Sequence, residues 1–295
     1  MINHAGILAF LVGTHFVVEV IMAIITVSRQ VGSGGDEIAR LVASKLNHEL
    51  IDQSEMHKLA EQCDPQFKKA CSLYERETFR GFMERYFSNH DAYKSLFESL
   101  HFELAAKGNV IILGRGGQMA LKGVPGVFHV RTVAPTEFRV EQVMRETGME
   151  KGEAADYVDS YGQERRRLIE SLFHAKLDDM SLYDLVINTT GFSAEAAADL
   201  IIMAAQNHSA AQTAPGASEE LGRKALAKKI ESAIRRECAC SHLRNIEVIV
   251  DTEGGATVSG VVIGNKFKDE AAAIASSFPG IKKVENNLIA VSTSM

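Results

Sequence analysis

A glycine-rich loop near the N-terminus has the residue types that bind phosphate. Gly32, Ser33, Gly34 and Gly35 lie between the apolar run 23–27 and a segment whose apolar residues recur at helical spacing. Glycines let the backbone approach an anion closely, and the N–H groups at the start of a helix stabilise negative charge without any side chain. The loop is therefore a candidate phosphate site. A plain strand-to-helix turn is the alternative, because short glycine clusters are common in loops.

The loop differs from the standard nucleotide-binding sequence GxxxxGK[ST], in which the lysine reaches the terminal phosphates and the hydroxyl holds magnesium. When residues 32–39 are superposed on it, Gly35 falls at the lysine position and Glu37 at the hydroxyl position, and Asp36 adds a carboxylate. These acids either stabilise the positive end of the helix dipole, or one of them holds Mg²⁺. In the second case Arg29, or an arginine from elsewhere, supplies the missing positive charge.

Arginines at two other places are suited to phosphate oxygens. Arg115, within the glycine-rich segment 114–117, follows an apolar run and is expected at the carboxyl edge of a sheet, where open α/β folds bind ligands. Arg165 and Arg166 belong to the run ERRR at 164–167, inside a helical stretch. A planar guanidinium binds phosphate through two hydrogen bonds. A solvated surface position is the alternative for each of them.

The elements that position these residues follow an alternating pattern. Short apolar runs are continuous, as expected for strands buried on both faces: 23–27, 110–113, 127–133 and 185–187. Between them lie stretches with helical spacing, at 38–46, 97–104 and 138–144. Alternating strands and helices predict an α/β fold with a parallel sheet.

The string SRQVGSGG at 28–35, followed by EIA at 37–39, resembles the signature of the cytidylate kinase-like family, a branch of the nucleoside monophosphate kinase fold. Further matches occur in order: LID at 50–52, ILGRGG at 112–117, VAPTEFR at 133–139 and SLYDLVINT at 181–189. The resemblance covers residues 23–206 and implies a P-loop kinase-like parallel sheet flanked by helices. The chain departs from the family at Asp36, where a basic residue is expected.

The resemblance also implies an activity, the ATP-dependent phosphorylation of a nucleoside monophosphate. Cytidylate as the acceptor is inherited from the family name alone. ATP with Mg²⁺ would bind at the glycine-rich loop, and Glu37 is the candidate metal ligand. Asp52, Arg115 and Arg139 would bind the acceptor, although Asp52 is equally consistent with a helix cap.

Arg165 and Arg166 lie where the family places a mobile lid over the phosphates. With Arg29 they are the predicted catalytic residues, because closing such a segment excludes water and offsets charge on the transferring phosphoryl group.

A second unit follows a predicted linker at 207–218, which is rich in Ala, Ser, Gln, Thr, Pro and Gly. The pattern then predicts helices at 219–236 and 266–277, and strands at 246–250, 257–262 and 284–291. The glycine turns and the ending FPGIKKVENNL resemble a BON domain over 219–295. Such domains are linked with envelope proteins and phospholipid contact, but we favour a regulatory module with a protein or small-ligand partner.

The net charge, the cysteines and the N-terminal segment bear on which partners, metals and compartment are expected. A net charge of -6 gives no general attraction to nucleic acid or anionic lipid. The four cysteines, Cys63, Cys71, Cys238 and Cys240, lack paired CxxC blocks, so no metal is predicted there. Residues 1–22 are apolar but have no basic start or cleavage pattern, and we interpret them as an extension before an alternative start at Met22 rather than a membrane anchor. A cytoplasmic protein is expected.

Two functional hypotheses remain open. Retention of Arg115 and of the arginine-bearing lid favours a nucleotide kinase, whereas loss of the loop lysine and hydroxyl favours a catalytically inactive nucleotide-binding regulatory protein. An envelope-associated binding protein would require the N-terminal segment to be an anchor.

Overall fold

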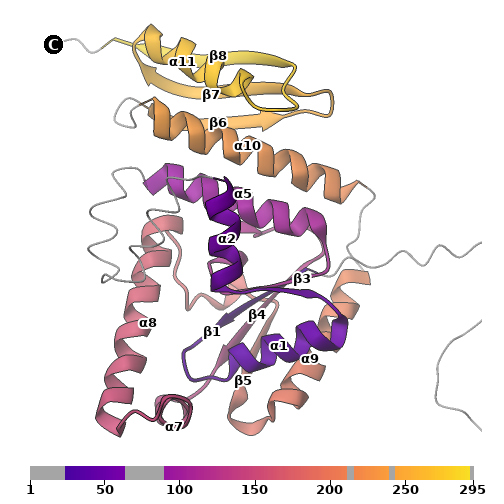
Figure 1. The fold of residues 1–295 in the computed structure, drawn as a ribbon, viewed down its shortest axis with the longest axis vertical. Coiled ribbons are helices and arrows are strands. Elements are labelled where there is room, and N and C mark those ends of the chain that lie inside the picture. Colours follow the sequence, from indigo (N-terminus) through magenta and orange to yellow (C-terminus); the bar gives the residue numbers. More distant parts are fainter. Residues whose placement is uncertain (1–23, 64–89, 211–215, 239–242, 293–295) are drawn as a thin grey trace, which may run out of the picture.

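The computed structural model describes residues 24–63, 90–210, 216–238 and 243–292 (Figure 1). Its larger part is built on a five-stranded sheet in the order β2-β3-β1-β4-β5, in which every neighbouring pair is parallel. The strands are β1 (Ile24–Arg29), β2 (Glu49–Ile51), β3 (Val110–Leu113), β4 (Val127–Val133) and β5 (Leu185–Asn188).

Helices cover both faces of this sheet, because successive strand residues point to opposite sides. On one face Ile25, Val27 and Ile111 pack with the helices α1 (Gly35–Leu46) and α9 (Ala194–Ala210). On the other face Ile24, Val110, Ile112 and Val127 pack with α2 (Gln53–Cys63) and α5 (His90–Lys107), and the short helix α6 (Gly117–Ala120) follows β3. The predicted α/β class with a parallel sheet is confirmed.

Two helices stand beside the sheet near the glycine-rich loop. Val140 and Val143 of α7 (Thr136–Thr147) pack against Ala154 and Val158 of α8 (Lys151–Phe173), with Val31 of the loop partly buried against them. Figure 1 shows α8 running along one side of the molecule. Short 3-10 helices at Met180–Leu182 and Thr189–Gly191 flank β5.

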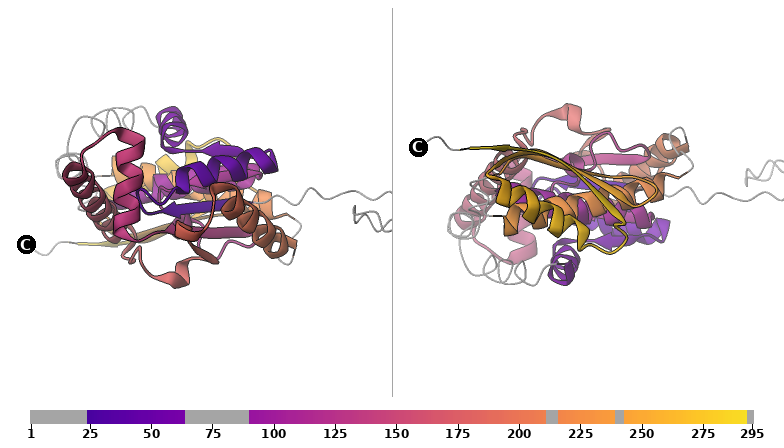
Figure 2. Two further views of the ribbon diagram at one scale, coloured as in Figure 1. Left: turned by 90° about the horizontal axis from the view of Figure 1, so that it is seen from below. Right: turned by 90° about the horizontal axis from the view of Figure 1, so that it is seen from above.

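The C-terminal part is a smaller α/β unit. Its helices are α10 (Ala217–Glu237) and α11 (Asn265–Ser276), and its strands are β6 (Leu243–Val250), β7 (Gly255–Ile263) and β8 (Lys283–Val291). The sheet has the order β6-β7-β8, with β6 antiparallel and β8 parallel to β7. Both helices share one core with one face of the sheet, and Figure 2 shows α11 beside the strands.

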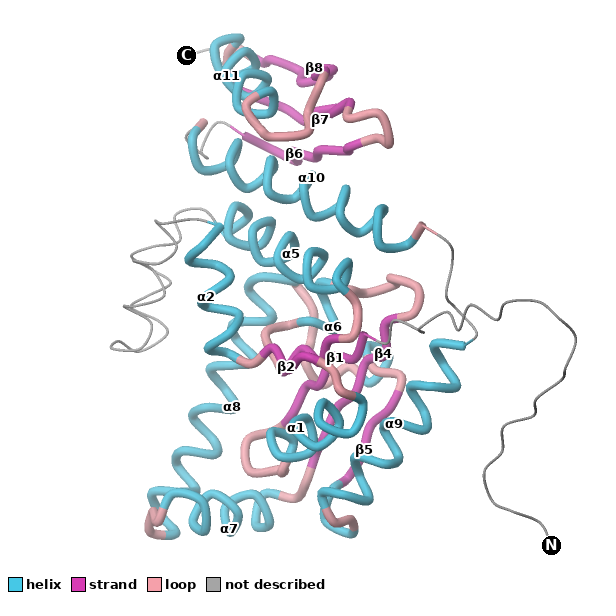
Figure 3. The backbone as a smooth tube through the Cα atoms, turned by 45° about the vertical axis from the view of Figure 1, so that its right-hand side comes forward, coloured by secondary structure: helices cyan, strands magenta, loops and turns pink. Residues whose placement is uncertain are grey.

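Helix α10 joins the two parts, since it lies between α5 and β6 (Figures 1 and 3). The buried carboxylate of Glu231 on α10 accepts hydrogen bonds from Ser95 Oγ of α5 at 3.1 Å and from the N–H of Val248 in β6 at 3.1 Å. Ser232 Oγ donates to the carbonyl oxygen of Ala92 at 2.9 Å. Helix α10 therefore contacts α5 of the larger part and β6 of the smaller part.

The structure modifies the predicted boundaries of the linker. Helix α9 continues to Ala210 and α10 begins at Ala217, so helix occupies both ends of the segment predicted as linker at 207–218. The predicted extension at 1–22 lies outside the described residues. No helix in the described ranges is long and apolar enough to cross a membrane.

Candidate phosphate-binding site

The glycine-rich loop connects β1 to α1, and its glycines are required by the backbone and by close packing. Gly32 and Gly34 have φ of 76° and 71°, the left-handed region that glycine adopts at little cost. A side chain at Gly32 would collide with the backbone of Arg139, and one at Gly35 would collide with Thr132 and Arg29. The N–H groups of the first turn of α1 have no carbonyl partner within the helix, so they are available to an anion.

Ser33 anchors the loop through both its hydroxyl and its carbonyl oxygen. Its side chain is fully buried, and Oγ donates to the carbonyl oxygen of Gln30 at 2.7 Å and lies 2.9 Å from Thr132 Oγ1. Thr189 Oγ1 donates to the Ser33 carbonyl oxygen at 2.9 Å. These bonds fix the loop on the sheet, which gives its remaining N–H groups a defined direction.

An ion pair crosses the loop. Nε and Nη2 of Arg29 donate to the two carboxylate oxygens of Asp36, at 3.1 and 2.9 Å. Burial raises the pKa of Asp36, but the hydrogen bond and charge of Arg29, together with Arg40 and Arg165, outweigh burial and hold this pKa below its ordinary value. The charge of Arg29 is therefore partly neutralised in this structure.

The superposition that gave the hydroxyl position to Glu37 is wrong, because a loop with Gly35 at the lysine position covers residues 29–36 and places Asp36 at the hydroxyl position. Lysine and hydroxyl are adjacent in GxxxxGK[ST], so a loop with Gly35 at the lysine position has Asp36 next. Glu37 is exposed on the outside of α1. Asp36, not Glu37, is the acid that faces the loop.

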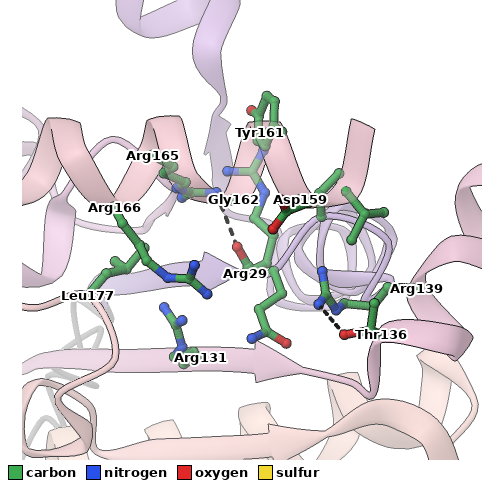
Figure 4. Close-up of a pocket in the computed structure, with 13 residues that line it drawn as sticks. Arg29, Arg131, Thr136, Arg139, Asp159, Tyr161, Gly162, Arg165, Arg166 and Leu177 are labelled. Atoms are coloured by element: carbon green, nitrogen blue, oxygen red, sulfur yellow. Dashed lines mark hydrogen bonds between the residues drawn. The ribbon is translucent and has the colours of Figure 1, made fainter. Parts of the chain in front are cut away.

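Five arginines from four elements line one pocket beside the loop (Figure 4). They are Arg29 at the end of β1, Arg131 of β4, Arg139 of α7, and Arg165 and Arg166 of α8. Tyr161, Gly162 and Asp159 of α8 and Thr136 of α7 also line it. Four of these arginines, all except Arg131, were predicted site residues, and the fold brings them together.

Arg165 is the arginine most enclosed by other cations. Its Nη1 donates to the carbonyl oxygen of Arg29 at 3.1 Å. Burial, the largest cause, and the charges of Arg29, Arg115 and Arg131 together lower the pKa of Arg165 to about 10, against the opposing effect of Tyr161. Within the described residues Arg165 forms no ion pair, so a bound anion is the partner that this arrangement lacks.

Arg139 is held by neutral groups at the other side of the pocket. Its Nε donates to the carbonyl oxygen of Ala134 at 3.0 Å, and Nη2 donates to Thr136 Oγ1 at 3.1 Å. Burial lowers the pKa of Arg139, and the charge of Arg166 lowers it further. The backbone of Arg139 also closes over Gly32, which joins α7 to the loop.

The fifth arginine, Arg131, was not predicted. It lies within a strand and only 2% of it is exposed, although its guanidinium faces the pocket. Nη2 of Arg131 donates to Asp178 Oδ1 at 2.6 Å, and Nε of Arg166 donates to the other oxygen of Asp178 at 3.0 Å. The carboxylate thus connects the sheet to α8.

The pocket has more positive than negative charge. Five arginines face three carboxylates, those of Asp36, Asp159 and Asp178, which leaves an excess of two positive charges. Asp159 accepts a hydrogen bond from Gln163 at 2.8 Å. A site with converging guanidiniums in excess attracts a polyanion such as a phosphate ester.

The predicted loop residues Gly32, Ser33, Gly34 and Gly35 lie beside this pocket rather than in its lining, and outside the loop three predicted residues do not line it. Asp52 accepts hydrogen bonds from the N–H groups of Ser54 and Glu55 at 2.8 and 3.1 Å, so the helix-cap alternative is observed for it. Arg115 follows β3 with φ of 57°, beside Gly114, where any side chain would collide with the guanidiniums of Arg29 and Arg165. Glu37 is exposed. Arg115 thus lies next to the arginine cluster, and the other two lie apart from it.

Magnesium would have few protein ligands here. Across the described residues, no group of three or more His, Cys, Asp or Glu is placed to hold a metal ion. Mg²⁺ in phosphoryl-transfer sites is commonly bound by one or two carboxylates plus phosphate oxygens and water. Asp36 at the loop fits that limited role, so the residues present are compatible with a magnesium ion that arrives with the nucleotide.

A parallel sheet of this order, with a glycine-rich loop after its central strand and an arginine-lined pocket above it, defines a P-loop kinase-like fold. Residues 24–191 match the sequence model of the cytidylate kinase-like family, and residues 223–292 match that of the BON domain. The first match covers more than half of the chain, and the protein belongs to the cytidylate kinase-like family. Both predicted resemblances are confirmed.

Similar proteins match parts of this chain at low to moderate identity. The cytidylate kinase of Methanocaldococcus jannaschii is 25% identical over 186 residues, which cover 62% of this chain and 98% of that kinase. The uronate isomerase of Corynebacterium glutamicum is 34% identical over 92 residues, which cover 31% of this chain but only 18% of that enzyme. The solved structure of an uncharacterized protein from Eubacterium ventriosum aligns with a TM-score of 0.47 at 19% identity, over 62% of this chain and 98% of the other.

Proposed function

We propose that this protein transfers the γ-phosphoryl group of ATP to a nucleoside monophosphate, with cytidylate, as CMP or dCMP, the favoured acceptor. The observation that carries the proposal is the convergence of five guanidiniums beside the glycine-rich loop. Phosphoryl transfer requires little covalent chemistry from a protein, because positioning and stabilisation of negative charge supply most of the rate. Membership of the cytidylate kinase-like family and the kinase of M. jannaschii support the same activity.

In this proposal the loop, Arg29 and the arginines of α8 each have a separate role. The N–H groups of the loop at Gly32–Gly35 bind the phosphates of ATP, and Arg29 supplies the cation that the loop lysine supplies elsewhere. Asp36 would help to hold a magnesium ion that binds with ATP, and the ion would offset the charge of the phosphates. Arg165 and Arg166 on α8 face the transferring group and stabilise its charge, and burial of Arg165 strengthens that effect by excluding water.

Arg115 and Arg139 bind the acceptor phosphate in this proposal. Arg139 lines the same pocket as Arg29 and Arg165, and Arg115 follows Gly114, which lies against the guanidiniums of Arg29 and Arg165. The carboxylate of Asp52 already caps a helix. In this proposal Asp52 therefore lines the nucleoside pocket without a free carboxylate for the ligand.

The C-terminal part is proposed to be a regulatory or interaction module with a protein or small-ligand partner, in a cytoplasmic protein. Its helix α10 packs directly on α5, which leads into β3 and Arg115. Helices α10 and α5 therefore connect a ligand bound to the C-terminal part with Arg115 on the acceptor side.

The ion pair between Arg29 and Asp36 favours a second candidate, a nucleotide-binding regulatory protein without turnover. This pair partly neutralises the charge of Arg29, and the loop beside it already lacks the usual lysine. The same experiment separates the two candidates.

That experiment measures ADP formation from ATP and Mg²⁺ with CMP, dCMP, UMP, AMP and GMP in turn, using the full chain. Turnover with one monophosphate that Arg165→Ala lowers by about 10²-fold supports the kinase. Nucleotide binding without turnover on any acceptor overturns the kinase in favour of the regulatory protein.

A further inference from the structure

Arg131 is a charged residue built into the floor of the pocket. Its Nη1 donates to Ser28 Oγ at 3.2 Å and to Tyr183 Oη at 3.0 Å, and its guanidinium lies 5.3 Å from the centre of the Tyr183 ring. Tyr183 is fixed in turn because its hydroxyl donates to the carbonyl oxygen of Leu177 at 2.8 Å. These contacts hold the guanidinium in one direction, toward the pocket.

The hydrogen bonds of Arg131 are incomplete. Within the described residues, its buried Nε has no hydrogen-bond partner. Burying a charged group in a strand costs several kcal/mol unless its charge and donors are matched. A buried arginine with an unmatched donor beside a pocket is therefore suited to a ligand that is absent from this structure.

Asp178 is the only carboxylate that contacts Arg131 in the described part of the chain, and it also contacts Arg166. Each of its oxygens accepts from one arginine, and its side chain is 49% exposed, in the loop between α8 and the 3-10 helix at Met180–Leu182. Figure 4 shows the guanidiniums of Arg131 and Arg166 close together, from the sheet and from α8. Two guanidiniums on two oxygens of one anion is also how arginines bind a phosphate.

We propose that Asp178 is an internal counter-ion that occupies the place of a ligand phosphate between Arg131 and Arg166. A phosphate carries more charge and more acceptor oxygens than a carboxylate, so it displaces the half-exposed Asp178 and contacts both arginines directly. Arg131 is then a phosphate-binding residue in addition to those of the glycine-rich loop. The inference rests on the proposed function only in taking the ligand to be a phosphate compound.

The test is calorimetric binding of inorganic phosphate to the full chain, without ATP or metal. Asp178→Asn keeps the size of the side chain and removes its charge, and we expect phosphate to bind about fivefold more tightly because it no longer competes with a carboxylate. Simple damage to the pocket would weaken binding instead. Circular dichroism melts confirm that each variant is folded.

Asp159→Asn is the matched control, because Asp159 lines the same pocket but accepts its hydrogen bond from Gln163 rather than from an arginine. It should change phosphate affinity by less than about twofold, the effect of a more distant charge. Adding Arg166→Met to Asp178→Asn should abolish the gain. Equal gains in both Asp→Asn variants, no gain in Asp178→Asn, or a gain that survives Arg166→Met would each overturn the proposal. Since no turnover is measured, these results are independent of whether the protein proves to be a kinase.

Discussion

Arg29 reaches over the glycine-rich loop and forms a two-point ion pair with Asp36, at 3.1 and 2.9 Å. Gly35 makes this possible, because any side chain at that position would collide with the Cβ of Arg29. The space that a side chain at Gly35 would take is therefore filled by the stem of Arg29, and the guanidinium of Arg29 lies against Asp36.

The first prediction concerns that pair. Asp36→Asn should increase the affinity for ATP measured without metal by about fivefold, because Arg29 no longer shares its charge with a carboxylate. Glu37→Gln is the matched control, since Glu37 lies in the same helical turn but is exposed and faces away from the loop. Isothermal calorimetry makes the comparison. An unchanged or lower affinity in Asp36→Asn would show that Arg29 is not a phosphate ligand.

The second prediction concerns Arg165. Arg165→Lys keeps a positive charge but loses the planar fork, whereas Arg165→Ala loses both. We expect kcat to fall about 10-fold in the lysine variant and about 10²-fold in the alanine variant, with a smaller change in KM, if this arginine acts mainly on the transferring phosphoryl group. Steady-state kinetics with the best acceptor test this. A rise in KM alone would reassign Arg165 to ground-state binding.

The third prediction concerns Arg115, whose φ of 57° lies in the left-handed region. Arg115→Ala should abolish binding of the acceptor monophosphate while the chain stays folded. Arg115→Gly should do the same, and it keeps the backbone conformation without strain, so it controls for a distorted loop. Calorimetric titration with CMP is the measurement. Unchanged affinity in the folded glycine variant would remove Arg115 from the acceptor site.

The fourth prediction concerns pH. His101 is fully buried on α5, its Nδ1 lies 2.7 Å from the carbonyl oxygen of Phe97, and burial lowers its pKa to about 4. The unfolded chain takes up this proton near pH 6.5, whereas the folded chain takes it up only near pH 4. The contribution of His101 to stability is therefore complete above about pH 6.5 and is lost as the pH falls toward 4, by up to ~1.4 kcal/mol per pH unit.

The test is the pH dependence of unfolding free energy in wild type and His101→Leu. The leucine variant should show a shallower fall in stability between pH 6.5 and 4, because one titrating group is removed. Parallel curves in the two proteins would mean that folding does not lower the pKa of His101.

The fifth prediction concerns the junction between the two parts. Glu231 is 2% exposed, and it accepts hydrogen bonds from Ser95 Oγ, the Val248 N–H and Lys228 Nζ. Glu231→Ala leaves these donors without their acceptor, and we expect a loss of about 3 kcal/mol in chemical denaturation. Glu231→Gln keeps an acceptor oxygen and should lose less. Equal stability of wild type and the alanine variant would show that the junction contributes little.

Much of the fold could be predicted from the sequence because its signals are local. Continuous apolar runs located β1, β3, β4 and β5, and helical spacing located α1, α5 and α7. The helical ends of the linker segment were missed because the alanine-rich residues near Ala210 and Ala217 suit both a helix and a flexible connection.

The candidate site was only partly predictable. Glycine-rich loops and paired arginines have recognisable sequence patterns, but Arg131 lies in the strand VFHVRTV, where one arginine among apolar residues gives no sign that it is buried. Its partners Asp178 and Tyr183 are distant in sequence, and only the packing of α8 and β5 beside β4 brings them together. The Arg29–Asp36 pair was missed for a similar reason, since the two residues are seven positions apart and the loop between them must turn before their side chains meet.

The most direct test of the central claim is phosphorus NMR of the full chain with ATP, Mg²⁺ and CMP, run in parallel with Arg165→Ala. This measurement distinguishes transfer to the acceptor from hydrolysis, because transfer produces ADP and CDP together whereas hydrolysis produces ADP and inorganic phosphate. We predict equal amounts of ADP and CDP with wild type and about 10²-fold slower formation with the variant. Inorganic phosphate alone, or no reaction with CMP and none when dCMP, UMP, AMP and GMP replace it in turn, would contradict the assignment of this pocket to phosphoryl transfer.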